Sequence, residues 1–246
     1  MKNILKLSAF LVFVSLIFPV NDLSAQLVGP VVSLQGNVFN QVTREPVTVY
    51  LWVLDENGER VNATRSNSAE NGYYYLTGLK PGNKYTVLLR SRDYLIEKHE
   101  IELAKSNRYQ EISKDFLVKP KKKDAWIKVP VPPYELNKSK LRFGHEYILD
   151  DMKGALKENP SVKVEIKSYP DNNNNPQENI ELTQERAESL KEYFVESGID
   201  ESRITISGSQ QTDPKNPPPQ EKSAKGKRYI GPSYLIVKDF DTKGTN

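Results

Sequence analysis

The sequence contains no cysteine. This absence excludes disulfide bonds, thiolate metal ligands, a cysteine nucleophile and a lipidated cysteine at the start of a mature chain. Histidine is scarce too, because His99 and His145 are the only two in 246 residues and form no H-x-x-x-H pair. No phosphate loop, no G-x-S-x-G and no Ser/His/Asp set is present. We therefore expect neither an enzyme nor a metal or other cofactor.

An excess of one charge is also missing. The chain has 35 Lys and Arg against 32 Asp and Glu, which gives a net charge of +3. A balance this close gives no indication of nucleic acid binding. The length of 246 residues fits one to two domains at ~150 residues each.

The longest apolar run lies at the N-terminus. Lys2 and Lys6 precede an apolar stretch at residues 8–20, which is shorter than the ~20 residues of a membrane helix. Residues 23–25 fit a signal-peptidase site, so residues 1–25 are interpreted as a secretory signal peptide, with an uncleaved anchor as the alternative. We expect a mature chain without a transmembrane segment, in a compartment outside the cytoplasm.

Residues 31–118 contain short segments in which apolar and polar residues alternate, separated by turn signals. Residues 47–53 alternate as a strand, and Asn57-Gly58 and Asn71-Gly72 supply the positive φ angles typical of hairpin turns. Strands this short at this spacing predict an all-β sandwich. The tyrosines at 73–75 favour cross-strand packing, and stacking on sugars is the alternative.

The same region resembles the carboxypeptidase regulatory-like domain. The resemblance is carried by Gly36-Asn37-Val38, Glu45-Pro46-Val47, Gly72-Tyr73-Tyr74 and the turn from Leu79 to Tyr85. It implies a transthyretin-like sandwich over residues 31–118 with a spacer or docking role. It implies no reaction.

Prolines and lysines concentrate in residues 119–132. Both disfavour regular structure, so this segment is predicted to be a solvated linker between two domains. The alternative is a set of lysines that touches an anionic surface.

Helix and strand patterns alternate through residues 133–240, which predicts an α/β domain of βαβαββ order. The expected elements are strands at residues 134–137, 162–166, 204–206 and 234–237 and helices at residues 144–158 and 187–197. Either Thr183 or Asn179 is expected to cap the second helix, and Gly198 to end it.

Two opposite charges stand at the ends of these elements. Asp171 follows the strand at 162–166, and Arg186 comes at the start of the second helix. A carboxylate and a planar guanidinium can hold the two ends of an amino-acid zwitterion. Asp171, Asn173 and Asn175 also mimic the start of a calcium loop, but Pro176 replaces the required glycine, so no metal site is predicted.

The layout D-x7-N-x2-L-[ST]-x2-R-A resembles the OmpA-like (OmpA/MotB) C-terminal domain, which binds peptidoglycan through diaminopimelate. It is met here by Asp171, Asn179, Leu182, Thr183, Arg186 and Ala187. By that resemblance Asp171 would bind the ammonium of diaminopimelate and Arg186 its carboxylate. Asn137 and Asn179 would add hydrogen bonds, and Lys227 would replace a second ligand arginine of the family.

The resemblance implies a non-enzymatic protein of a Gram-negative envelope, in the periplasm and associated with the outer membrane, that anchors to the diaminopimelate stem peptide. Several residues depart from the family pattern. Ser168-Tyr169-Pro170 stands where the family has G-H-T, and Pro170 removes a backbone N–H. These departures favour the alternative, a degenerate OmpA-like scaffold subunit of an envelope, secretion or motility complex that acts through protein contacts.

Overall fold

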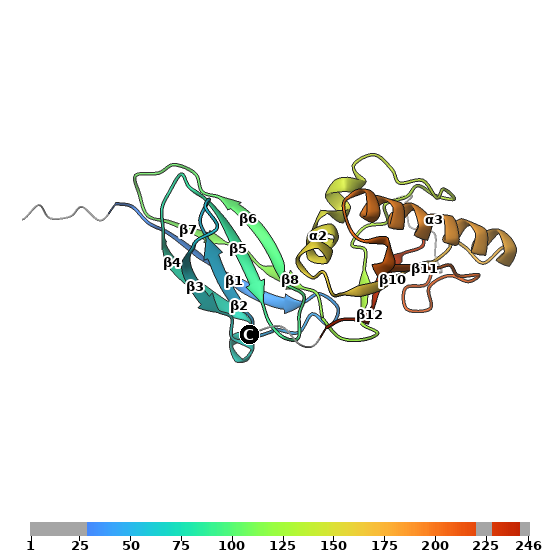
Figure 1. Ribbon diagram of the computed structural model, residues 1–246, viewed down its shortest axis with the longest axis horizontal. Coiled ribbons are helices and arrows are strands. Elements are labelled where there is room, and N and C mark those ends of the chain that lie inside the picture. Colours follow the sequence, from blue (N-terminus) through green and yellow to red (C-terminus); the bar gives the residue numbers. More distant parts are fainter. Residues whose placement is uncertain (1–28, 220–227, 242–246) are drawn as a thin grey trace, which may run out of the picture.

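The computed structural model describes residues 29–219 and 228–241. The predicted signal peptide and Lys227 lie outside these residues. The first half consists of strands and one short 3-10 turn, and strands and helices alternate in the second half, shown at the right of Figure 1. None of the helices within the described ranges is long and apolar enough to cross a membrane.

The first half contains two sheets. One has the order β4-β1-β7 with β8 also paired to β1, and the other has the order β3-β2-β5-β6. The strands are β1 (Val32–Asn40), β2 (Tyr50–Leu54), β3 (Arg60–Arg65), β4 (Tyr73–Leu79), β5 (Lys84–Arg90), β6 (Glu97–Glu102), β7 (Gln110–Ser113) and β8 (Phe116–Val118), and the 3-10 turn η1 (Ser68–Glu70) lies between β3 and β4. Every second side chain of β1 and β5 is buried, and the buried residues of both sheets, such as Leu34 and Val87, pack together in one core. We call this first half the strand unit.

The second half contains one sheet of the order β11-β10-β12-β9. Its elements are β9 (Trp126–Lys128), α2 (His145–Glu158), β10 (Lys163–Ser168), α3 (Pro176–Glu196), the 3-10 turn η2 (Glu201–Arg203), β11 (Ile204–Ser207) and β12 (Ser233–Asp239). β10 pairs parallel with β11 and antiparallel with β12. The apolar faces of both helices and of the sheet share one core that includes Leu149, Ile166 and Leu190.

The βαβαββ order is present, but its first strand is not where the sequence predicted it. Tyr134 forms only an isolated bridge to Leu141. The first strand is β9, inside the predicted linker, where Ile127 and Val129 are buried as β9 pairs with β12. Lys119 is buried as well. The expectation of a solvated linker is therefore wrong for these residues, because alternate apolar side chains outweigh the nearby prolines and lysines.

The second helix begins earlier than predicted. α3 starts at Pro176, and the side chain of Asn175 caps it by accepting hydrogen bonds from the N–H groups of Gln177 and Glu178. A proline suits the first helical position because its missing N–H would be unpaired there anyway. Asn179 and Thr183 thus lie inside the helix, and neither caps it. Gly198, with φ of 92°, follows the helix end as predicted.

The two halves are in direct contact. Asn159, at the end of α2, accepts a hydrogen bond from the N–H of Ile96 at 3.0 Å and donates one to the Ile96 carbonyl at 2.9 Å. Leu95 of the strand unit is buried in the core of the second half. This amide clamp fixes α2 beside the start of β6.

Candidate functional site

Asp171 and Arg186 meet in the second half as a buried ion pair. Asp171 lies three residues beyond β10, and Arg186 projects from the middle of α3 rather than from its first turn. The Arg186 Nη1–Asp171 Oδ1 distance is 2.7 Å and the Nη2–Oδ2 distance is 2.9 Å. Their side chains are 0% and 1% exposed. The contact is the bidentate fork that a guanidinium makes with a carboxylate.

The remaining donors of Arg186 are also occupied. Nε donates to the carbonyl of Lys138 at 2.9 Å, Nη1 to that of Tyr169 at 3.3 Å and Nη2 to that of Glu135 at 3.3 Å. With the two bonds to Asp171, all five guanidinium N–H groups have an acceptor. Arg186 therefore joins α3 to the segment around residues 135–138 and to the end of β10.

Asp171 is equally well satisfied. Its Oδ2 accepts the backbone N–H of Asn137 at 2.7 Å, and its Oδ1 accepts that of Gly231 at 2.7 Å. A side chain at position 231 would collide with the Tyr169 carbonyl, because a Cβ there would lie 2.0 Å from that oxygen. Gly231 thus helps to hold the Asp171 carboxylate, and the sequence interpretation did not place it in the site. Its only signal was the Gly-Pro dipeptide before β12.

Tyr134 packs against the buried side of Arg186. Its hydroxyl donates to the Arg186 carbonyl at 2.6 Å, and its ring centroid lies 5.0 Å from the guanidinium carbon. Burial raises the pKa of this phenol well above its usual range, so it stays a neutral donor. Residues 134–137, which the sequence predicted to be the first strand, instead contact the Asp171–Arg186 pair.

The other predicted site residues behave differently. Asn137 reaches Asp171 through its backbone N–H, while the residue itself is exposed with φ of 54°. Asn179 is buried, and its amide donates to the carbonyls of Asn172 and Gln210 at 2.8 and 2.9 Å. Asn179 thus ties two loops to α3. Lys227 lies outside the described residues.

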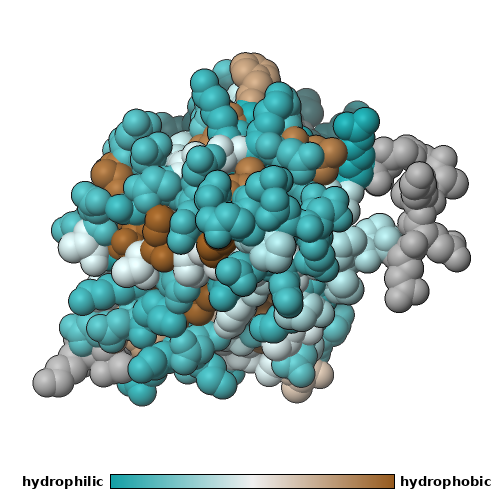
Figure 2. Space-filling view, turned by 90° about the vertical axis from the view of Figure 1, so that its right-hand side faces the viewer, coloured by the Kyte–Doolittle hydropathy of each residue, from teal (hydrophilic) through white to brown (hydrophobic). Residues whose placement is uncertain are grey.

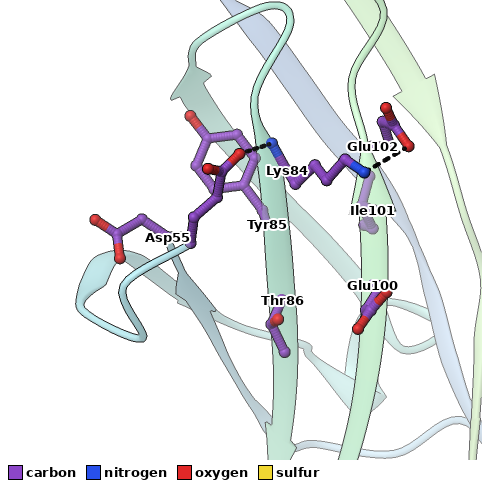
Figure 3. Close-up of a pocket in the computed structure, with 8 residues that line it drawn as sticks. Asp55, Lys84, Tyr85, Thr86, Glu100, Ile101 and Glu102 are labelled. Carbon is purple, nitrogen blue, oxygen red and sulfur yellow. Dashed lines mark hydrogen bonds and ion pairs between the residues drawn. The ribbon is translucent and has the colours of Figure 1, made fainter.

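Two surface hollows occur away from this pair. One of about 280 Å³ lies beside β5 and β6 and is lined by acids such as Asp55, Glu100 and Glu102 (Figure 3). Lys84 already pairs with Glu102 there at 3.4 Å. The other, of about 510 Å³, lies between the halves, and Trp126 is among the residues that line it. Neither hollow is lined by Asp171 or Arg186.

The histidines are not arranged as ligands. His99 packs against Phe116 with ring centroids 4.9 Å apart, and burial lowers the pKa of its imidazole to about 4. His145 starts α2, and its Nδ1 lies 2.9 Å from the Arg142 carbonyl. Among residues 29–219 and 228–241, no group of three His, Asp or Glu side chains is placed to hold a metal ion.

The second half is an α/β domain that encloses the buried Asp171–Arg186 ion pair. Residues 134–228 match the family model described as the OmpA family and form an OmpA-like domain. Outer membrane protein P5 of Haemophilus influenzae is 30% identical over 81 residues, which is 33% of this chain and 23% of that protein. The chain thus covers less than a quarter of that relative.

Solved structures give weaker likenesses. The peptidoglycan-associated lipoprotein of Burkholderia pseudomallei matches with a TM-score of 0.35 and 15% identity over 43% of this chain and 86% of its own. The periplasmic domain of Helicobacter pylori MotB matches with a TM-score of 0.38 and 9% identity over 64% and 84%. A 3-chlorocatechol 1,2-dioxygenase of Rhodococcus opacus matches with a TM-score of 0.30 and 13% identity over 37% and 60%. Scores of this size support no argument about function.

Proposed function

We propose that this chain is a non-enzymatic protein of the cell envelope whose OmpA-like domain binds peptidoglycan. The family match over residues 134–228 supports the class, and the buried Asp171–Arg186 pair is the observation that carries the proposal. The face seen at the α/β end is largely hydrophilic, with hydrophobic residues scattered among polar ones (Figure 2). A surface of this kind suits contact with a hydrated polymer better than insertion into lipid.

The ligand in this proposal is the free zwitterionic end of diaminopimelate. Its ammonium replaces the guanidinium at Asp171, and its carboxylate replaces Asp171 at Arg186. Each charge keeps a partner of opposite sign, and the inserted group adds no net charge to the buried site. Asn137 and Gly231 continue to donate to the carboxylate of Asp171. The entry of ligand requires the loops at residues 135–138 and 228–231 to part.

The affinity of one such module should be modest. Charge-assisted hydrogen bonds contribute ~1.5–3 kcal/mol each. The ion pair between Asp171 and Arg186 must break before the ligand can form such bonds. Association also costs several kcal/mol in lost freedom. A weak, reversible attachment to a repetitive polymer follows, so the assay must use the whole sacculus rather than a single soluble fragment.

Co-sedimentation with diaminopimelate-containing sacculi tests the proposal. Wild-type protein should pellet, free diaminopimelate should release it, and cadaverine, which lacks both carboxylates, should not. Asp171→Asn and Arg186→Lys should lose pelleting. The matched control is Glu97→Gln, which alters a buried carboxylate of the strand unit and should pellet normally. Thermal melts must show that every variant is folded at the assay temperature. Unchanged pelleting of the folded Asp171→Asn variant would exclude this site.

A second candidate function is a protein scaffold in an envelope complex. It is favoured by one observation, the complete occupation of the Arg186 donors by Asp171 and three carbonyls. In this case the pair only holds the fold together. Wild-type protein would not pellet with sacculi, and an envelope protein would co-purify with it in fixed ratio through the strand unit.

A further inference from the structure

Three tyrosine rings lie exposed on one face of the strand unit. Tyr73 and Tyr75 project outward from β4, and Tyr109 precedes β7 across the same sheet. Their exposures are 38%, 43% and 55%, whereas Tyr74, which points inward between the first two, is 1% exposed. Of these tyrosines of β4, only Tyr74 is buried in the core, as the sequence interpretation expected. The strand order β4-β1-β7 places the other three on one surface, which we call the tyrosine face.

Each exposed ring is tethered by its hydroxyl. The Tyr73 hydroxyl donates to Gln35 Oε1 at 2.8 Å, and the Tyr75 hydroxyl lies 3.0 Å from Ser33 Oγ. The residue opposite Tyr73 is Asn37 and the residue opposite Tyr75 is Gln35, so both rings lean by two residues in the same direction along β1. A ring that leans over the sheet with its hydroxyl fixed presents a flat, ordered face to solvent.

The tether continues across the sheet to β7. Tyr109 donates to Glu111 Oε2 at 3.1 Å, and Glu111 Oε1 accepts the amide of Gln35. The side chains of Tyr75 and Tyr109 also interact with each other. The three rings and the groups between them are thus one connected layer over three strands.

The outward positions between and beside the three rings are small or polar, and Phe39, two residues beyond Asn37 on β1, is the partly exposed apolar residue at the end of this strand. The small or polar positions are Ser33, Gln35, Asn37, Thr77, Glu111 and Ser113. None of them carries the positive charge that an anionic lipid surface or nucleic acid requires. Flat aromatic faces alternating with amide, hydroxyl and carboxylate groups suit a pyranose chain, whose rings offer C–H faces and hydroxyl edges.

We propose that the tyrosine face binds the glycan strand of peptidoglycan, with sugar rings stacked on Tyr75 and its two neighbours. The choice of this polysaccharide rests on the proposed function, because the OmpA-like domain of the same chain is assigned to the peptide of that polymer. The two contacts then act on one polymer through different chemistry, and a linked second contact raises the overall affinity without tighter individual sites.

Isothermal titration of the purified chain with peptide-free glycan strands from sacculi tests this site. These strands lack diaminopimelate, so Asp171→Asn should bind them like wild type. Tyr75→Ala, and the double variant Tyr73→Ala, Tyr109→Ala, should each lose at least tenfold in affinity, about 1.4 kcal/mol. Tyr75→Phe retains the ring and should retain most of the binding. The matched control is Tyr50→Ala, which removes a tyrosine that is 54% exposed on the other sheet and should change nothing.

Several outcomes would overturn the inference. One is wild-type protein that pellets with intact sacculi through Asp171 but does not bind peptide-free strands, a result that leaves the proposed function intact. A second is equal affinity of Tyr75→Ala and wild type for the peptide-free strands. A third is equal affinity of the wild-type protein for amylose and for these strands. Glycan binding that persists when Asp171→Asn has no effect on sacculi would instead sustain this site and reject the diaminopimelate site.

Discussion

Each half of this molecule buries a carboxylate–cation pair, and the two pairs are built differently. In the second half, Asp171 accepts donors from three separate segments, through Arg186, Asn137 and Gly231. In the strand unit, Glu97 accepts two hydrogen bonds from one residue, the backbone N–H and the Nζ of Lys119, both at 2.8 Å. The planar fork of arginine fixes its partner's orientation, whereas lysine offers a point charge on a flexible stem.

The surroundings of the Glu97–Lys119 pair are less well satisfied. His99 Nε2 lies 3.8 Å from Glu97 Oε2 and has no hydrogen-bond partner among the described residues. Desolvation raises the pKa of Glu97, and the charge and hydrogen bonds of Lys119 offset this in part. Both pairs are buried, so burial of a charge pair alone does not define a binding site. What distinguishes the Asp171 pair is the convergence of several loops on it.

The largest expected effect is on the arginine pair. Arg186→Met should lower the free energy of unfolding of the second half by about 3–5 kcal/mol, because Asp171 is then a buried charge without its partner. Urea denaturation followed by circular dichroism measures the loss. The double variant Asp171→Asn, Arg186→Met should recover part of it. A loss below about 1 kcal/mol for Arg186→Met would show that the loops open easily around the pair.

A smaller and pH-dependent effect is expected for the lysine pair. A carboxyl whose folded pKa is raised above its usual 4.5 contributes stability that is complete below that value and is lost as the pH rises through the folded pKa. Lys119→Met removes the ammonium group, whose charge and hydrogen bond hold this pKa down, and leaves the backbone N–H at position 119 in place. The variant should therefore be close to wild type at pH 5 and about 1–3 kcal/mol less stable at pH 8.

Thermal melts from pH 5 to 8 measure this dependence. Lys114→Met is a suitable control, because Lys114 also belongs to the strand unit and makes no contact with Glu97 that would be lost. The comparison between the two pairs fails if Lys119→Met is equally destabilising at both ends of the pH range. In that case Glu97 remains charged throughout this pH range.

Sequence patterns predicted the parts of the molecule that depend on local periodicity. The alternation at residues 47–53 indicated the strand core. The structure brings Asp171 and Arg186 into a direct ion pair, with Arg186 in the middle of α3 rather than in the first turn where the sequence predicted it. The pattern did not predict that the pair is closed, because the N–H groups of Asn137 and Gly231 come from distant segments. It also assigned Lys119 to solvent, because a lysine beside prolines shows no local sign of a buried partner at Glu97.

The smallest expected effect is on the exposed ion pair between Lys98 and Glu158, which shows how much a charge pair contributes when it is not buried. Lys98 Nζ lies 2.8 Å from Glu158 Oε1 and links β6 to α2, but the two side chains are 48% and 28% exposed. Lys98→Ala should change the free energy of unfolding by less than about 1 kcal/mol, because water and salt screen an exposed pair. Urea denaturation at 0.05 and 1 M salt, about 14 and 3 Å of screening length, measures it. A loss as large as that of Lys119→Met would show that contact between the halves, rather than desolvation, sets the value of these pairs.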